Sequence, residues 1–181
     1  MDAPDGELRF RKAALFDLPE VFRLFTAAIR HMDELGIPQW DEIYPNKAVL
    51  RRDILRRELF VGILEGRIAC AFALSRQCDE EYASGAWRYP NAPFMVIHRL
   101  CVHPAFQNRR VAARAMTYIE RRLSCRRIRA VRLDAFSLNP YALRLYERLG
   151  YEKTGEVRFR KGLFYLYEKP LAAPPRKTPG I

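Results

Sequence analysis

A short apolar segment that ends at a proline and leads into a helix is the feature that most restricts the folds open to this chain. Residues 94–102 (FMVIHRLCV) are mostly apolar, and His103-Pro104 ends the segment because proline cannot continue a central strand. Residues 109–124 then place apolar side chains on one helical face. Such a connection directs N–H groups and the positive end of the helix dipole outward. It predicts a phosphate site, with an ordinary solvated connection as the alternative.

The same periodicity analysis predicts the other elements. Asp17 is expected to cap the first helix, and Pro19 to lie in its first turn. The predicted strands cover residues 7–13, 59–66, 67–76, 94–102, 130–136, 151–157 and 163–169, and the predicted helices cover 17–36, 47–57, 109–124 and 139–149. Strands before and after intervening helices indicate one mixed α/β sheet with helices on both faces.

Length and composition limit the class of protein. The chain has 181 residues, of which 49% are hydrophobic, so we expect one folded domain over residues 1–170. The Pro-rich segment 171–181 is expected to be disordered. The acidic, polar first ten residues do not resemble a secretory signal, and no apolar run is long enough for a membrane helix. We therefore expect a cytoplasmic protein that does not span a membrane.

The four cysteines and the charges carry different information. The cysteines lack the paired spacing of a zinc site, so no metal is expected, and without a secretory signal disulfides are not expected either. Ten arginines and one acid, Glu120, fall between Arg99 and Arg132, so this stretch carries +9 of the formal net charge of +11. Such a block indicates nucleic acid, an anionic surface or a phosphorylated cofactor as partner, unless it is only a solvated helix face.

Two motifs resemble those of one enzyme superfamily. Val102-His103-Pro104 followed by Gln107-x-x-Arg110-x-Ala112 resembles the cofactor motif of the GNAT acetyltransferases. Asn139-Pro140-x-Ala142-x-x-Leu145-Tyr146-x-x-x-Gly150-Tyr151 resembles their second motif. Gln39-Trp40, Tyr44-Pro45, His98-Arg99 and Tyr167-Glu168-Lys169 are similar to a bacterial branch of that superfamily. The resemblance covers roughly residues 7–169.

The resemblance implies a mostly antiparallel sheet with a bulged central strand that splays from its parallel neighbour. It implies acetyl-CoA as cofactor, with the strand end pairing with the pantetheine amides and polarising the thioester carbonyl. The implied cofactor-binding residues are Leu100, Cys101, Val102, Gln107, Asn108, Arg109, Arg110, Val111, Ala112, Ala113 and Asn139. Arg109, Arg110 and Arg114 would surround the phosphates, and Tyr146 matches the tyrosine that protonates the departing thiolate. The alternative for Tyr146 is an interior residue packed by its ring.

Arg110 departs from the motif, which has glycine at this position, and Asn108 also stands where glycine is frequent. Glycine lets phosphate oxygens approach the backbone without an intervening Cβ. Cofactor binding survives this change if the φ angle of Arg110 is negative and its side chain turns away. We expect binding to be retained, because Ala112, Asn139 and Tyr146 are all present. A catalytically inactive relative that senses a CoA metabolite or assembles with partners is the alternative.

The reaction that the resemblance implies is direct acetyl transfer to a primary amine of a small molecule or peptide, without a metal. His98 is the leading candidate for the general base. Other base candidates are Asp41, Glu42, Glu80 and Glu81, whereas Asp134 is expected to hold a loop amide or pair with Arg99. The acceptor pocket is predicted from Gln39, Trp40, Tyr44, Tyr82, Trp87, Arg99 and Phe164, with both tryptophans as loop anchors in the alternative view.

Nucleic-acid binding is a competing function that the sequence favours less. The basic block is not interleaved with exposed aromatic residues, and no nucleic-acid recognition motif is present. Assembly as a homodimer is left open.

Overall fold

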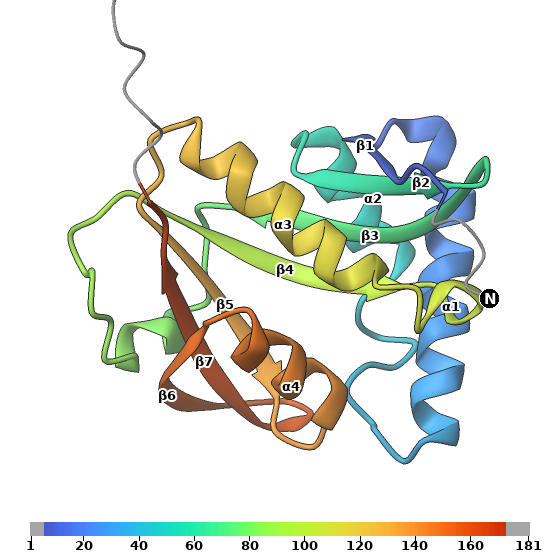
Figure 1. Ribbon diagram of the computed structural model, residues 1–181. Coiled ribbons are helices and arrows are strands. Elements are labelled where there is room, and N and C mark those ends of the chain that lie inside the picture. Colours follow the sequence, from blue (N-terminus) through green and yellow to red (C-terminus); the bar gives the residue numbers. More distant parts are fainter. Residues whose placement is uncertain (1–5, 173–181) are drawn as a thin grey trace, which may run out of the picture.

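A single seven-stranded sheet organises the computed structural model, which describes residues 6–172 (Figure 1). Its strands are β1 (Arg9–Lys12), β2 (Leu59–Leu64), β3 (Arg67–Ser75), β4 (Phe94–Val102), β5 (Ala130–Phe136), β6 (Glu152–Phe159) and β7 (Gly162–Pro170). They lie in the order β1-β2-β3-β4-β5-β7-β6. Every neighbouring pair is antiparallel except β4 and β5, which are parallel. The expected mixed, mostly antiparallel sheet is therefore confirmed.

Helices cover both faces of this sheet, as expected. The helices are α1 (Leu18–Glu34), α2 (Lys47–Leu55), α3 (Val111–Ser124) and α4 (Pro140–Arg148), and the 3-10 turns are η1 (Leu15–Asp17), η2 (Glu80–Ser84) and η3 (Pro104–Phe106). Figure 1 shows α3 and α4 in front of the sheet and α1 and α2 behind it. Separate clusters of buried apolar side chains join each helix pair to its own face of the sheet.

The starts of the helices differ in part from the sequence expectation. Pro19 lies in the first turn of α1, as expected, but the Asp17 side chain does not cap that helix. Its carboxylate instead accepts a hydrogen bond of 2.8 Å from the Ala14 N–H and pairs with Arg11 at 2.6 Å. The φ and ψ angles of Asp17 are already helical, and its carboxylate bonds to the turn before α1 instead of to the N–H groups of α1. Asn46 caps α2 by accepting from the Val49 N–H at 3.0 Å.

All four helices end in the same type of turn, in which a residue with positive φ follows the helix. Gly36 and Gly150 occupy this position after α1 and α4, whereas Arg57 and Arg127 occupy it after α2 and α3. The paired backbone hydrogen bonds of each turn are those of the Schellman motif. Glycine is favoured there because it has no Cβ.

The parallel pairing of β4 and β5 is short. Phe94–Ile97 pair with Ala130–Leu133, and β4 has no partner on its β5 side beyond Ile97. The two strands therefore separate toward the C-terminal end of β4 (Figure 1). This is the splayed opening that the resemblance implied.

A β-bulge in β4 accompanies this separation. His98 pairs with Ala73 and Cys101 with Ala71, so β4 has one residue more than β3 in this interval. Arg99 takes up the difference with a φ of 54°, a left-handed conformation that non-glycine residues seldom adopt. The implied bulged strand is confirmed.

Two expectations concern the ends and the environment of the chain. Most of the tail predicted to be disordered, residues 173–181, lies outside the described residues. Within residues 6–172, no helix combines the length and apolar character needed to cross a membrane.

Candidate active site

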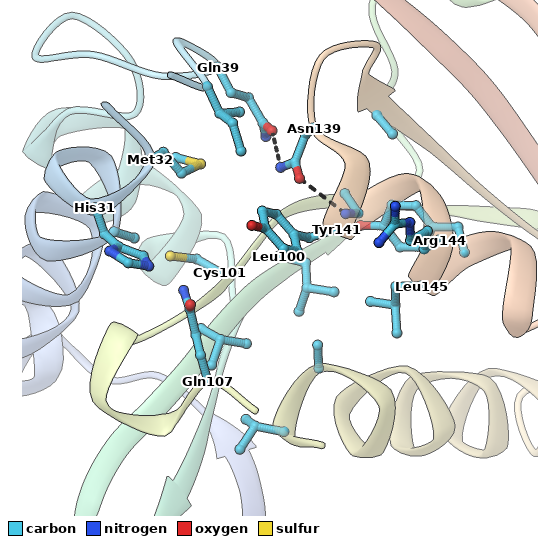
Figure 2. Close-up of a pocket in the computed structure, with 18 of the residues that line it drawn as sticks. His31, Met32, Gln39, Leu100, Cys101, Gln107, Asn139, Tyr141, Arg144 and Leu145 are labelled. Carbon is cyan, nitrogen blue, oxygen red and sulfur yellow. Dashed lines mark hydrogen bonds between the residues drawn. The ribbon is translucent and has the colours of Figure 1, made fainter. Parts of the chain in front are cut away.

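A cavity of about 670 Å³ fills the opening between β4 and β5. Leu100–Val102 form its floor, the loop and helix start around Gln107–Ala113 form one wall, and α4 forms the other. Figure 2 shows His31 and Met32 of α1 on one side of this cavity and Asn139, Tyr141, Arg144 and Leu145 on the opposite side. We call it the first cavity.

The loop before α3 keeps a backbone that suits glycine. The φ angles of Asn108 and Arg110 are 60° and 55°, so both residues are left-handed. The negative φ at Arg110 under which cofactor binding would survive is therefore absent. This loop must turn from η3 into α3 within four residues, and the two left-handed residues make that turn. No side chain caps the start of α3, which leaves its first N–H groups available to an anion.

The cations beside the first cavity are not all those expected. Arg109 pairs with Glu65 and lies over the Phe106 ring, and Arg114 donates to the Gly6 carbonyl at 3.1 Å. Neither Arg109 nor Arg114 lines the cavity, whereas Arg110 does.

Two further arginines line this cavity from α4, and the sequence reasoning missed them. Arg144 and Arg148 are four residues apart, so they share one helix face. That spacing within the second motif is the signal that could have identified them.

A second cavity of about 480 Å³ adjoins the first. Of the predicted acceptor residues, it brings together Gln39, Trp40, Tyr44, Arg99 and Phe164. His98 also lines it. The two cavities share Gln39, Trp40, Leu100, Asp134 and Tyr146, so they meet where β4 leaves β5.

Tyr82 and Trp87, which were predicted to bind the acceptor, line neither cavity. Tyr82 is buried, and its hydroxyl donates a hydrogen bond of 2.6 Å to Asp134. The indole N–H of Trp87 donates to the Tyr82 carbonyl at 2.8 Å, and Arg132 lies over the indole ring. Both residues anchor the segment that contains η2. Trp40 is also buried, against Phe25, but it borders both cavities.

Tyr146 lies at the junction of the two cavities. Its side chain is buried, and its ring packs against Tyr151 and Tyr167 with centroid separations of 5.9 and 6.1 Å. Burial raises the pKa of its hydroxyl well above the usual value, and the nearby Asp134 carboxylate adds to the shift. The packed ring and the place at the junction are both present, so the two interpretations of this residue are compatible.

His98 projects from the bulged strand with a defined hydrogen bond. Its Nε2 lies 3.0 Å from the Gln77 carbonyl oxygen, which can only accept, so Nε2 carries the proton and Nδ1 has the lone pair. Burial and the neighbouring Arg99 lower the pKa of the imidazole below its usual 6.5. His98 is thus neutral and able to accept a proton near pH 7.

Asp134 borders both cavities, and burial raises the pKa of its carboxyl group. It holds the η2 segment through the Tyr82 hydroxyl rather than through a backbone amide. The expected pair between Asp134 and Arg99 is not formed. Arg99 instead donates to Asp53 and to the Tyr44 hydroxyl, each at 2.6 Å.

The pair of Arg99 and Asp53 is buried, with side-chain exposures of 10% and 3%. Asp53 belongs to α2 and lies 46 residues before Arg99 in the sequence, and no local pattern marks it. The ion pair joins the bulge of β4 to α2, and the Tyr44 hydroxyl joins the same guanidinium to the loop before α2. Arg99 therefore holds three segments around the second cavity.

The acidic candidates for the base separate into two groups. Glu81 lines the second cavity, whereas Asp41, Glu42 and Glu80 line neither cavity. Asp41 pairs with both Arg160 and Lys161, and the Arg160 hydrogen bond is the main cause that lowers the pKa of its carboxyl group.

Asn139, which was expected to bond the cofactor arm, has two partners within the chain. Its Oδ1 accepts from the Ala142 N–H at 3.1 Å, which caps α4. Its Nδ2 donates to Gln39 Oε1 at 2.8 Å across the mouth of the opening (Figure 2). The amide of Asn139 is therefore held in a fixed orientation beside the first cavity.

Comparisons with known proteins agree with this architecture. The model of the acetyltransferase (GNAT) family matches residues 27–151. A GNAT-family acetyltransferase structure from Streptococcus agalactiae has a TM-score of 0.80 at 24% identity, covering 91% of this chain and 96% of its own. A GNAT-family structure from Listeria monocytogenes has a TM-score of 0.75 at 22% identity, covering 94% and 99%.

A third similar structure contains a ligand. The PaiA N-acetyltransferase of Thermoplasma acidophilum in complex with coenzyme A has a TM-score of 0.69 at 14% identity, covering 91% of this chain and 99% of its own. No curated protein sequence matches the chain. Since the family model spans more than half of the residues and the fold agrees with it, this chain belongs to the acetyltransferase (GNAT) family, whose members use acetyl-CoA.

Proposed function

We propose that this protein transfers the acetyl group of acetyl-CoA directly to a primary amine of a small molecule or peptide. The observation that carries the proposal is the meeting of two cavities at Leu100 of β4, Asp134 and Tyr146. One cavity has uncapped helix N–H groups and arginines, which suit a phosphorylated donor, and the other has His98 and aromatic walls, which suit an amine.

The residues around the first cavity fit acetyl-CoA. The β5-facing edge of β4 at Leu100–Val102 has no strand partner, so its backbone groups can bond the pantetheine amides and the thioester carbonyl. The loop amides before α3, together with Arg110, would hold the pyrophosphate. The bound thioester supplies an activated acetyl group and a thiol leaving group.

Proton removal from the acceptor is assigned to His98. A primary amine is an ammonium ion near pH 7 and must lose a proton before it attacks a carbonyl carbon. The neutral imidazole of His98 offers Nδ1 for this proton, and its Nε2–H bond to Gln77 fixes the ring. The carboxylate of Asp134, which borders both cavities, would attract the incoming ammonium ion.

Tyr146 is assigned to the leaving thiolate. Its raised pKa keeps the hydroxyl protonated near pH 7, so an O–H donor is present there. The same shift makes the phenol a weak acid. We therefore expect the O–H to stabilise the sulfur first as a hydrogen-bond donor and to transfer the proton as the thiol forms.

The test compares two tyrosine variants in acetyl-CoA turnover and in isothermal titration with acetyl-CoA. Tyr146→Phe is expected to lower kcat by about 10²-fold or more with little change in acetyl-CoA affinity, because only the hydroxyl is lost. Tyr167→Phe is the matched control, since this buried tyrosine contacts Tyr146 but lines neither cavity. An unchanged kcat in Tyr146→Phe would remove the residue from this role.

The titration also separates the proposal from its alternatives. Absence of acetyl-CoA binding at millimolar concentration would contradict the proposed function. Binding without turnover of any amine would instead identify an inactive relative that senses a CoA metabolite. The cytoplasmic location expected from the sequence is part of the proposal, and microscopy of a fluorescently tagged chain tests it.

A further inference from the structure

Two cations from distant parts of the chain, Lys12 and Arg122, lie over one buried ring, and Arg57 and Arg126 lie near Lys12. Lys12 ends β1, Arg57 follows α2, and Arg122 and Arg126 lie at the C-terminal end of α3. Lys12 Nζ is 5.8 Å and Arg122 Cζ is 5.1 Å from the centroid of the Phe60 ring, so both cations make cation–π contacts with the same ring. We call these four residues the basic patch.

The positive charge of the basic patch is not compensated by the folded chain. Among residues 6–172, none of the four cations forms an ion pair with a carboxylate, although Arg11, Arg99 and Arg132 each do so elsewhere. Burial and the three neighbouring arginines lower the pKa of Lys12. The four cations therefore repel one another, and an external anion would relieve this repulsion.

Arginine stands here where the backbone favours glycine. Arg57 and Arg127, the second of which directly follows Arg126, have φ angles of 59° and 60° at the ends of α2 and α3. The equivalent positions after α1 and α4, away from the basic patch, are Gly36 and Gly150. Non-glycine residues therefore hold the strained left-handed conformation at the two helix ends that belong to or adjoin the patch. At the other two helix ends, glycine takes this position without strain. A role for the cations outside folding would explain this difference.

The chemistry of the patch favours a nucleic-acid duplex over other polyanions. Cores of protein–protein interfaces are poor in charged residues, whereas protein–DNA interfaces are strongly basic. Guanidinium groups match phosphate oxygens in geometry, and three of the four cations are arginines. The Phe60 ring is buried, so no base can stack on it as in single-strand binding. A second copy of this chain is disfavoured as the partner, because it carries the same net charge of +11.

We propose that the basic patch binds the phosphate backbone of a nucleic-acid duplex without reading its base sequence. None of the four residues lines either cavity, so this surface is separate from the proposed acetyl-transfer site. The inference does not depend on the proposed reaction.

Fluorescence anisotropy with a labelled 20-base-pair duplex at about 50 to 200 mM salt tests the proposal. If each cation neutralises one phosphate, log K falls with log salt at a slope of about −3.6. Arg57→Gly is expected to weaken binding roughly five- to tenfold at about 0.1 M salt and to reduce the steepness of the slope by about 0.9. The same variant is expected to melt at the same or a higher temperature, because glycine suits a φ of 59°.

Loss of binding without loss of stability separates this role from a structural one. The double variant R23Q/R30Q on α1 is the control, since these exposed arginines are not part of the basic patch, and it keeps duplex affinity within twofold. The matched double variant R122Q/R126Q reduces the steepness of the slope by about 1.8 while leaving acetyl-CoA titration unchanged. Absence of duplex binding at about 50 mM salt, an Arg57→Gly variant with unchanged affinity and slope, or tighter binding of poly-glutamate than of the duplex would each overturn the proposal.

Discussion

Arg110 shows how a single residue can depart from a motif while the backbone keeps the form that the motif provides. Its φ of 55° is the conformation that glycine adopts freely, and for a residue with a Cβ it costs about 1–2 kcal/mol. The loop amides therefore remain directed toward the cavity. The side chain adds a cation beside it in place of the open space that glycine would leave.

Replacement of Arg110 separates these two effects. Arg110→Gly is expected to raise the free energy of unfolding by about 1 kcal/mol relative to Arg110→Ala, or about 2–4 °C in Tm, because alanine retains the left-handed strain. Thermal unfolding of both variants measures this difference. Equal melting temperatures would contradict a left-handed backbone at this position. Titration of both with acetyl-CoA shows what the lost cation contributes.

His98 leads to a prediction about pH. Because burial and Arg99 lower its pKa, the imidazole is neutral above the usual value of 6.5 and becomes protonated only at lower pH. A base acts in its neutral form, so kcat/KM is expected to stay level near pH 7 and to fall as the pH drops through this lowered pKa. His98→Gln keeps a donor for the Gln77 carbonyl and should remove this acidic limb. If the kcat/KM profile of His98→Gln kept the same fall at low pH, His98 would be excluded as the base.

At the scale of elements, the bulge of β4 depends on α2. Arg99 holds a left-handed conformation within a strand, and its guanidinium is fixed by Asp53 and by the Tyr44 hydroxyl. Both partners come from segments that pack behind the sheet. We infer that the ion pair keeps the bulge in place and so sets the direction of the Leu100–Val102 edge.

Asp53→Asn tests this inference. It leaves the buried guanidinium of Arg99 without a counter-charge, which is expected to lower the free energy of unfolding by about 3–5 kcal/mol. It is also expected to weaken acetyl-CoA binding, since the strand edge shifts. Glu168→Gln breaks the similarly buried pair with Arg132, whose residues line neither cavity. We expect this control to lose similar stability in denaturant unfolding and to keep its acetyl-CoA affinity. Equal affinity in both variants would contradict the inference.

At the scale of the whole molecule, the candidate site lies at the seam of the sheet. The strands β1 to β4 and β5 to β7 are joined by only the short parallel pairing of β4 with β5. The two cavities share Leu100, Asp134 and Tyr146 at this seam. A donor in one cavity and an acceptor in the other would therefore meet at one point.

The positive side chains behind the net charge of +11 lie in separate parts of the molecule. Arg110, Arg144 and Arg148 border the first cavity, and the basic patch lies at the ends of β1, α2 and α3. Other arginines, such as Arg11 and Arg132, are paired with acids. Part of the excess charge therefore borders the first cavity, and another part forms the basic patch.

Local periodicity was sufficient for the elements and for the order of the two motifs. The strand 94–102 and the strand 130–136 were predicted with the bounds that the structure has, because apolar runs and their terminating residues are adjacent in sequence. Asp17 was misassigned as a helix cap because a pattern marks a capping residue but not a competing partner such as Arg11.

The sequence alone therefore determined the strands, the helices and the mixed sheet, and its resemblance to the GNAT family singled out Tyr146 and His98 as candidates. Only the tertiary structure decided which residues meet across the fold: Arg99 with Asp53, Asp134 with Tyr82, and both Lys12 and Arg122 with the Phe60 ring. It also decided that Tyr82 and Trp87 anchor a loop and that Arg110 is left-handed. The reason is physical: backbone periodicity follows from neighbouring residues, whereas ion pairs, buried hydroxyls and backbone strain follow from packing between segments far apart in the chain.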